Sequence, residues 1–258
     1  MKILNKIAVV PDVHGKSFWE KAKENIDSVD EVVFLGDYLD SYTFKGLANR
    51  EIELNNFLEI LKFKKEYPEK VVLLLGNHDI GYLLRLGCSR QTYGEMFDKY
   101  QNLFEENIDL FQMTEYVQLN NKKIFFSHAG ILTKWAELVN RKLKLGDSDY
   151  LKSAILEGLF NGLILKYKES DYREFLRWVL WLVGPARGGF NGSCGSIVWA
   201  DSTEWEGEEN FFGTDITQVF GHNRLSSDMF LAEGVKCVDS VSPEVLFWEC
   251  DFENKYES

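Results

Sequence analysis

Short apolar runs, each followed at once by a polar cluster rich in glycine or aspartate, recur along this chain. Runs without polar alternation are typical of strands that are buried on both faces of a sheet. Segments with helical period separate them, such as Phe18–Ser28 and Arg50–Tyr67, and strands that alternate with helices define the α/β class. The runs that predict strands are Ile7–Val10, Val32–Leu35, Val71–Leu75, Ile124–Phe126, Ile197–Trp199, Val219–Phe220 and Val235–Val238.

The stretch 133–183 differs from the rest because it carries helical spacing alone. Leu151 and Ile155, for example, recur at this spacing, and no apolar run typical of a strand interrupts them. We therefore expect a helical insertion or cap over about residues 133–190. No composition shift marks a linker, so a single domain over 1–258 is the simplest organisation.

Charge and hydropathy exclude several classes of function. The 258 residues include 29 Lys or Arg and 41 Asp or Glu, a net charge of −12. Binding to nucleic acid depends on basic patches, so no nucleic-acid polymer is expected as a partner. No apolar run approaches the roughly 18 residues of a membrane helix, and Ile7–Val10 is too short for a secretory signal. We expect a cytoplasmic protein without a membrane partner, and the sequence carries no signal for an oligomeric state.

All four histidines of the chain follow apolar runs of this kind. In α/β sheets, functional groups collect just beyond the carboxyl ends of the strands. A single polar cluster of this kind is common in loops, but a whole series of them in this order is not. We therefore predict that these clusters form one shared site. The polar residues at these places are Asp12, His14, Asp37, Asp40, Asn77, His78, Asp79, His128 and His222.

These residue types suit a pair of divalent cations. Asp12 and His14, two apart on an extended segment, project to the same side. Asp37 offers a carboxylate that can bridge two ions, and Asn77 offers an amide oxygen. Oxygen and nitrogen ligands without thiolate indicate Mn, Fe or Zn, with Mn favoured. Two ions about 3.5–4 Å apart can share a water, lower its pKa towards ~7 and neutralise charge on a phosphoryl group.

The polar clusters also resemble the motifs of a known enzyme superfamily. They read, in order, DVHG, GDYLD, GNHD, SHAG and GHN, which is similar to the five signature blocks of the calcineurin-like metallophosphoesterases. Trp199 and Asp201 resemble the Trp-x-Asp element of the phosphoprotein-phosphatase branch. The resemblance implies an α/β fold in which two mixed β-sheets pack as a sandwich with helices on the outside.

The resemblance further implies a ligand set and a reaction. The implied ligands of the first metal are Asp12, His14 and Asp37, and those of the second are Asp37, Asn77, His128 and His222. Asp37 would bridge the two ions. The implied reaction is hydrolysis of a phosphomonoester by a hydroxide that bridges the metals.

The resemblance gives His78 the role of the acid that protonates the leaving alcohol, oriented by Asp40. An imidazolium beside a carboxylate is a suitable acid near neutral pH. The alternatives are a packing role for His78 and a turn or helix cap for Asp40. Asp79 is expected to be a cap or an acceptor for backbone N–H groups, and Gly76 and Gly221 to permit tight turns.

The block GDYLD departs from the family pattern. Ser41 and Tyr42 stand where protein phosphatases have Arg-Gly, and that arginine grips the substrate phosphate. We expect another arginine to replace it. Arg187, between the glycines of GPARGG, is preferred over Arg224 and Arg85, and the alternative for each is a surface ion pair.

The missing arginine leaves a second function open. A phosphodiesterase or dinucleotide-polyphosphate hydrolase could use the same metals, because diesters carry less charge per phosphate. A third possibility is a non-catalytic scaffold. The complete set of metal ligands argues against it, because a scaffold does not need them. For the leading function, the expected substrate is a phosphorylated small molecule or a phosphoprotein.

Overall fold

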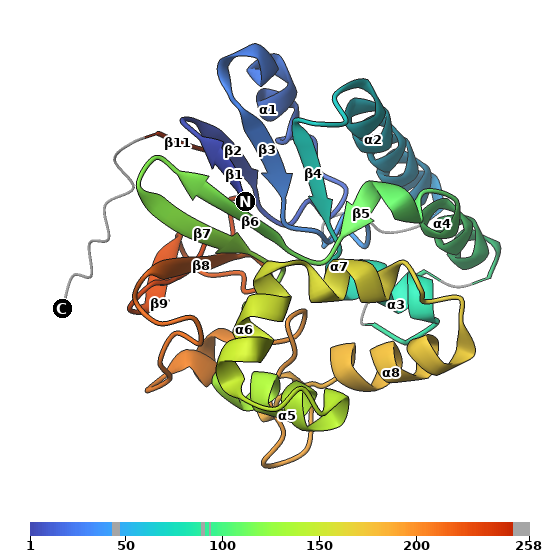
Figure 1. The fold of residues 1–258 in the computed structure, drawn as a ribbon. Coiled ribbons are helices and arrows are strands. Elements are labelled where there is room, and N and C mark those ends of the chain that lie inside the picture. Colours follow the sequence, from blue (N-terminus) through green and yellow to red (C-terminus); the bar gives the residue numbers. More distant parts are fainter. Residues whose placement is uncertain (43–46, 89–90, 93, 250–258) are drawn as a thin grey trace.

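The computed structural model of the chain describes residues 1–42, 47–88, 91–92 and 94–249. Two β-sheets that pack against each other form its centre (Figure 1). The five-stranded sheet contains, in spatial order, β11 (Leu246–Trp248), β2 (Ile7–Val10), β3 (Glu31–Phe34), β4 (Val71–Leu74) and β5 (Phe111–Gln112). Strands β2 to β5 are parallel, whereas β11 is antiparallel to β2.

The second sheet has six strands. In spatial order they are β1 (Lys2–Leu4), β6 (Glu115–Leu119), β7 (Lys122–Phe126), β8 (Ile216–Phe220), β10 (Val235–Cys237) and β9 (Met229–Ala232). Strands β7, β8 and β10 run parallel to one another. Their carboxyl ends therefore meet at one edge of the sheet, as those of β2, β3 and β4 do in the other sheet.

The central strands are buried on both faces, which explains their continuous apolar runs. Successive side chains of a strand point to opposite faces. In β2, Ile7 and Val9 pack into the layer between the sheets, and Ala8 and Val10 belong to the larger cluster that includes the helices. The layer between the sheets contains Leu4, Ile7, Val9, Val33, Leu35, Val72, Leu74, Val117, Leu119, Ile124, Phe126, Val219 and Val238.

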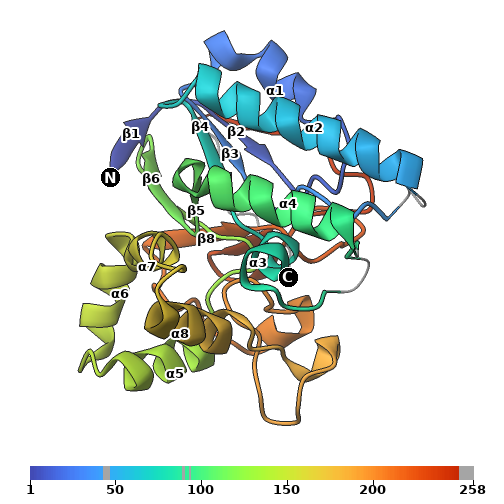
Figure 2. The same ribbon diagram turned by 90° about the vertical axis from the view of Figure 1, so that its right-hand side faces the viewer.

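Helices cover the five-stranded sheet on its outer side. They are α1 (Glu20–Glu24), α2 (Leu47–Glu66) and α4 (Glu95–Glu106), and the short α3 (Asn77–Leu84) follows β4. Figure 2 shows α2 and α4 lying across this sheet. The predicted fold class, α/β with two mixed sheets and helices outside, is confirmed. Across the described residues, no helix combines the length and the apolar character that crossing a membrane would require.

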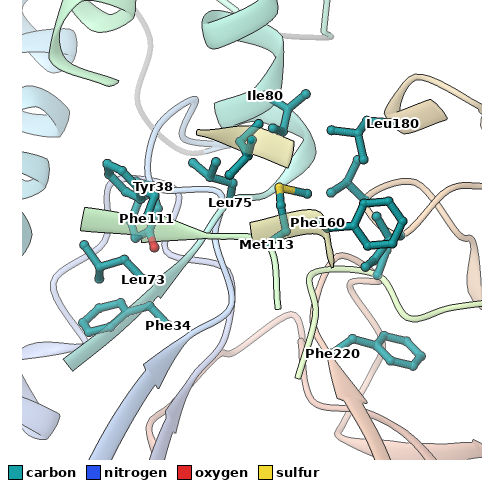
Figure 3. Packing of buried hydrophobic residues seen from close by; sticks show 14 of the residues in the cluster. Phe34, Tyr38, Leu73, Leu75, Ile80, Phe111, Met113, Phe160, Leu180 and Phe220 are labelled. Carbon is teal, nitrogen blue, oxygen red and sulfur yellow. The ribbon is translucent and has the colours of Figure 1, made fainter. Parts of the chain in front are cut away.

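Aromatic packing fixes α2 to the sheet close to the predicted site. Phe57 of α2 stacks on Tyr38 with ring centroids 5.2 Å apart, and it lies 4.9 Å from Phe104 of α4. Figure 3 shows Tyr38 beside Phe111 of β5 in the same group of aromatic side chains. Because Tyr38 directly follows Asp37, this packing also holds the loop after β3.

The connection from β7 to β8 contains four α-helices. They are α5 (Thr133–Leu143), α6 (Ser148–Leu156), α7 (Leu159–Ile164) and α8 (Ser170–Leu180). They lie on the opposite side of the molecule from α1 and α2 (Figures 1 and 2). Phe160 of α7 packs 5.3 Å from Trp135 of α5, so these helices contribute to the same apolar cluster as the sheets.

One predicted strand is wrong. Ile197–Trp199 forms a turn, in which the Trp199 N–H donates to the Ser196 carbonyl at 2.9 Å. The carbonyl of Ile197 accepts a hydrogen bond from the Ala129 N–H at 2.8 Å. Ile197 and Val198 are buried and Trp199 is partly buried, because this turn packs against the SHAG loop; burial without strand pairing gives the same sequence pattern.

Candidate active site

The structure brings all six predicted metal ligands together at the carboxyl ends of β2, β3, β4, β7 and β8. Asp12, His14 and Asp37 form one group, and Asp37, His128 and His222 form another. Within each group, one potential ligand atom per residue lies within 4.8 Å of the others, and every member is buried. Asp37 belongs to both groups, which is the position that a bridging carboxylate needs.

The first group presents a neutral imidazole. His14 Nδ1 donates to the Leu39 carbonyl at 2.9 Å, which leaves Nε2 with its lone pair. This Nε2 lies 3.6 Å from Asp37 Oδ2 and 4.0 Å from Asp12 Oδ2. Burial lowers the pKa of His14 to about 4, so the ring is neutral at physiological pH.

The second group crowds acceptor atoms together. His128 Nδ1 donates to the Leu35 carbonyl at 2.7 Å, and burial lowers the pKa of His128, so Nε2 carries a lone pair. That nitrogen lies 3.0 Å from Asn77 Oδ1, 3.2 Å from His222 Nδ1 and 3.7 Å from Asp37 Oδ2. The His128 nitrogen, the Asn77 amide oxygen and the Asp37 carboxylate are all acceptors, and such atoms repel each other unless a cation lies between them, so this set of ligand atoms fits a divalent metal ion.

Further residues set the orientation of these ligands. Cys88 Sγ accepts a hydrogen bond from Asn77 Nδ2 at 3.5 Å, so the amide oxygen points towards His128. The Asp12 carboxylate accepts from the His222 N–H at 3.0 Å. His222 Nε2 is buried and has no hydrogen-bond partner among the residues that the structure describes. The sequence motifs contain no signal for Cys88.

The backbone is strained at four of the site residues. His14, Asp37, Asp40 and His222 have φ values of 44°, 53°, 62° and 63°. Residues other than glycine rarely adopt this left-handed region, and such strain tends to collect at functional sites. The surrounding hydrogen bonds therefore have to hold these loops in place.

Asp79 is the acceptor that holds the loop of the shared ligand. Its Oδ2 accepts from the N–H groups of Asp37 and Gly76, both at 2.8 Å, and its Oδ1 accepts from the Tyr38 N–H at 3.2 Å. Burial raises the pKa of Asp79 to about 8, with the charge of Asp37 adding to the shift. The structure thus gives Asp79 the backbone-acceptor contacts expected from the sequence.

Two glycines allow the carboxylates to approach the backbone. A Cβ atom on Gly76 would lie 2.1 Å from Asp37 Oδ1, and one on Gly221 would lie 2.2 Å from Asp12 Oδ1. No side chain fits at either place. Both glycines therefore leave the space that the ligand carboxylates occupy, in addition to forming turns.

The carboxylates of the site repel one another. Burial raises the pKa of Asp12 well above its usual value, and the charges of Asp239 and Asp37 add to this. Burial also acts to raise the pKa of Asp37, but nearby imidazoles outweigh it and hold the pKa below its usual value. Asp239 was not among the predicted residues, although it follows the apolar run Val235–Val238, the signal that identified the others.

His78 and Asp40 form a buried pair next to the ligand groups. His78 Nδ1 lies 2.7 Å from Asp40 Oδ2, and the His78 ring is 5.3 Å from that of His14. Burial acts to lower the pKa of His78, but the charge of Asp37 and the hydrogen bond with Asp40 raise it to about 9. His78 therefore holds a proton at neutral pH, as an acid must.

Arg187 reaches the edge of the second group. Its Nε donates to Asp201 Oδ2 at 2.6 Å and its Nη2 to Asn223 Oδ1 at 2.9 Å, and 30% of its side chain is exposed. Burial lowers the pKa of both His128 and His222, and the positive charge of Arg187 adds to this. The guanidinium is thus close to the ligands and accessible.

The other two arginines differ in position. The Arg224 guanidinium lies 5.4 Å from the Tyr42 ring centroid, and that ring packs edge-on against His14 at 4.6 Å. Arg224 therefore borders the first group. Arg85, at the C-terminal end of α3, donates to the exposed Asp98 at 3.0 Å. Arg85 therefore forms a surface ion pair, which was the alternative to a role in phosphate binding.

Comparison with known proteins identifies the family of this chain. The family model described as calcineurin-like phosphoesterase matches residues 5–227. The chain belongs to this family, as the motifs indicated.

Individual relatives are more distant. The chain is 26% identical over 132 residues to the serine/threonine-protein phosphatase 4 catalytic subunit of Eremothecium gossypii, which covers 48% of this chain and 38% of that protein. It is 25% identical over 134 residues to the same subunit of Saccharomyces cerevisiae, covering 48% and 39%. A solved Saccharomyces cerevisiae serine/threonine phosphatase with similarity to human phosphatase PP5 aligns with 92% of this chain and 67% of its own, at a TM-score of 0.47 and 15% identity.

The two curated relatives agree with the predicted phosphoprotein-phosphatase branch. The chain spans less than two fifths of the length of either curated relative.

Proposed function

We propose that this chain is a metal-dependent phosphatase that hydrolyses phosphomonoesters. The observation that carries the proposal is Asp37, a buried carboxylate shared by two groups of metal-binding atoms. A protonated His78 beside these groups supports it. The family is one of phosphoesterases, and the similar proteins are named serine/threonine phosphatases, which favours a phosphoprotein over a phosphorylated small molecule as substrate.

The proposed cofactors are two divalent metal ions. One would be held by Asp12, His14 and Asp37, and the other by Asp37, Asn77, His128 and His222. Mn, Fe and Zn all suit these ligands, and manganese is our first choice. When bound, such ions lower the pKa of a water towards ~7 and neutralise charge that develops on a phosphoryl group.

His78 would supply the proton for the leaving alcohol. Its Nδ1 is engaged with Asp40, so the proton for the substrate has to come from Nε2. An alkoxide is a poor leaving group, and a positioned acid accelerates its departure by about 10²–10⁴-fold. The acid matters most for esters of weakly acidic alcohols.

Arg187 and Arg224 would bind the substrate in place of the missing arginine after Asp40. We name these two residues the arginine rim. Arg187 is favoured for the phosphoryl oxygens because its Nη2 donates to Asn223, the residue after the predicted ligand His222. Arg224 lies on the side of His14, where Tyr42 supports it.

We also propose that 1–258 form one metallophosphoesterase domain and that about 133–190 act as a cap beside the site. Arg187 supports this assignment, because it lies near the end of that range and donates to Asn223, next to His222.

The test is hydrolysis by protein freed of metal with a chelator and then given Mn²⁺. An aryl monophosphate and a bis-aryl phosphate are compared at one metal concentration. We expect hydrolysis only with metal, and at least about tenfold higher kcat/KM for the monoester. A preference for the diester would favour the phosphodiesterase, and hydrolysis of neither ester with Mn²⁺, Fe²⁺ or Zn²⁺ would favour the scaffold.

A further inference from the structure

The Asp40 carboxylate has partners beyond His78. Its Oδ2 faces His78, while its Oδ1 accepts from the Tyr82 hydroxyl at 2.7 Å and from Arg50 Nη1 at 3.3 Å. Asp40 and Tyr82 are fully buried. The two oxygens of this carboxylate are therefore fixed by different partners, and the shorter contact on Oδ1 comes from the tyrosine.

The direction of the tyrosine hydrogen bond is determined by a second contact. The Thr92 N–H donates to the Tyr82 hydroxyl oxygen at 3.1 Å. A hydroxyl has one proton, and the oxygen already accepts from a backbone amide, so its proton points to Asp40. Burial raises the pKa of Tyr82, and the charge of Asp40 adds to this, so the hydroxyl keeps its proton.

The Tyr82 ring is held rigidly. It lies 5.1 Å from Phe97, 5.4 Å from Tyr100 and 6.3 Å from Phe104, measured between ring centroids. Tyr82 is also four residues after His78 on α3, and side chains at this spacing share one helix face. The helix that carries His78 thus also carries the donor to the carboxylate that orients it.

We propose that Tyr82 is a positioning residue for the general acid, which it serves by locking the Asp40 carboxylate against His78. The inference rests on the proposed phosphatase function and on His78 as its acid. Tyr82 contacts none of the predicted metal ligands through its hydroxyl. Its loss should therefore weaken proton donation without removing the metals.

The test compares Tyr82→Phe with Tyr100→Phe in the full chain loaded with Mn²⁺. Tyr100 is the matched control, because its buried ring packs in the same cluster and its hydroxyl donates to the Arg50 carbonyl at 2.8 Å. Each variant loses one buried hydroxyl, but only one of these hydroxyls bonds to Asp40. Turnover is measured on phenyl phosphate, which has a poor leaving group, and on 2,4-dinitrophenyl phosphate, which needs no acid.

We expect Tyr82→Phe to lower kcat on phenyl phosphate by about tenfold, the usual effect of one hydrogen bond to a charged group. KM, bound metal and kcat on dinitrophenyl phosphate should change by less than about twofold, since general acids act on the leaving group. Tyr100→Phe should leave all of these within the same limit. An equal loss on both esters, or no loss on either, would overturn the role of Tyr82.

A spectroscopic measurement on the chain loaded with Zn²⁺, which does not broaden nearby proton resonances as Mn²⁺ does, provides a second readout that does not depend on turnover. The Nδ1 proton of His78 gives a downfield proton NMR resonance, which is assigned by its absence from His78→Asn. This resonance should shift in Tyr82→Phe and remain in place in Tyr100→Phe, and an unchanged resonance in Tyr82→Phe would overturn the proposal. If the wild-type chain hydrolyses neither ester, the phosphatase function and this inference are both overturned. If the wild-type chain is active but the two variants behave alike, only the inference is overturned.

Discussion

The six predicted metal ligands, which we call the ligand cluster, lie next to the arginine rim but are built differently from it. The ligand cluster contains Asp12, His14, Asp37, Asn77, His128 and His222. The ligand cluster is buried, and backbone groups orient it: His14 and His128 each donate to a carbonyl, and Asp12 accepts from an amide. In the arginine rim, Arg187 is 30% exposed, and Arg224 rests on the face of Tyr42.

This difference follows from what each part has to bind. Bringing carboxylates and imidazoles within 4.8 Å of one another requires strained loops and close glycines, which only a rigid core can hold. A phosphate group carries its own charge, so a half-exposed guanidinium is enough to attract it. We therefore expect changes in the ligand cluster to affect kcat and metal content, and changes in the arginine rim to affect KM.

The largest effect is expected from Asp37→Asn. Its carboxylate belongs to both groups, so its loss should remove metal from both and reduce hydrolysis of an aryl phosphate by more than about 10⁴-fold. Metal per protein is measured by mass spectrometry after gel filtration. Asp98→Asn, at an exposed carboxylate on α4, is the control and should retain full metal and activity.

His78→Asn should lower kcat by about 10²–10⁴-fold while bound metal is unchanged. The pH profile provides an independent check. Burial acts to lower the pKa of His78 and the hydrogen bond with Asp40 acts to raise it. The acid works only while it is protonated, so kcat should fall as the pH rises through this pKa. That decline should be absent in His78→Asn. Equal turnover of the variant and the wild type would remove the acid from the mechanism.

Gly221→Ala tests how tightly the ligand cluster is packed. The added methyl would lie 2.2 Å from Asp12 Oδ1, so the carboxylate must move. Residues that orient ligands usually change metal affinity by about 10–100-fold, and we expect a loss in this range by titration with Mn²⁺. Gly87→Ala is the control, because its methyl would meet no atom within 4 Å.

Arg187→Gln should have the smallest effect and should act on binding. KM for an aryl phosphate should rise about tenfold, the effect of losing one charge-assisted hydrogen bond, while metal content stays constant. Arg85→Gln removes an arginine that pairs with Asp98 and should change nothing. A fall in metal content in Arg187→Gln would mean that the arginine rim and the ligand cluster are one unit.

The ligand cluster was predictable because each member follows a strand. The apolar runs end at the carboxyl edges of two sheets that pack against each other, so residues as distant as Asp12, after β2, and His222, after β8, meet where these two edges adjoin. Arg187 lies beside Asn223, next to His222, whereas Arg85 pairs with Asp98, but no pattern required either position, and the role of Arg187 in substrate binding stays a prediction. Where these guanidiniums lie depends on loop paths, which local sequence does not determine.

Other features could not be predicted because they depend on tertiary packing. Ile197–Trp199 is apolar like a strand, yet its backbone pairs within a turn. Cys88 orients Asn77 through a contact across eleven residues. Tyr82 reaches Asp40 only because α3 packs beside the loop after β3. The one sequence signal for Tyr82 is its helical spacing from His78, which is equally typical of a core tyrosine.

The most direct test is anomalous X-ray scattering from crystals of the chain grown with Mn²⁺. The account predicts two manganese peaks, one among Asp12, His14 and Asp37 and one among Asp37, Asn77, His128 and His222, with the Asp37 carboxylate contacting both. No peak at these side chains, or a single peak that Asp37 does not touch, would contradict it.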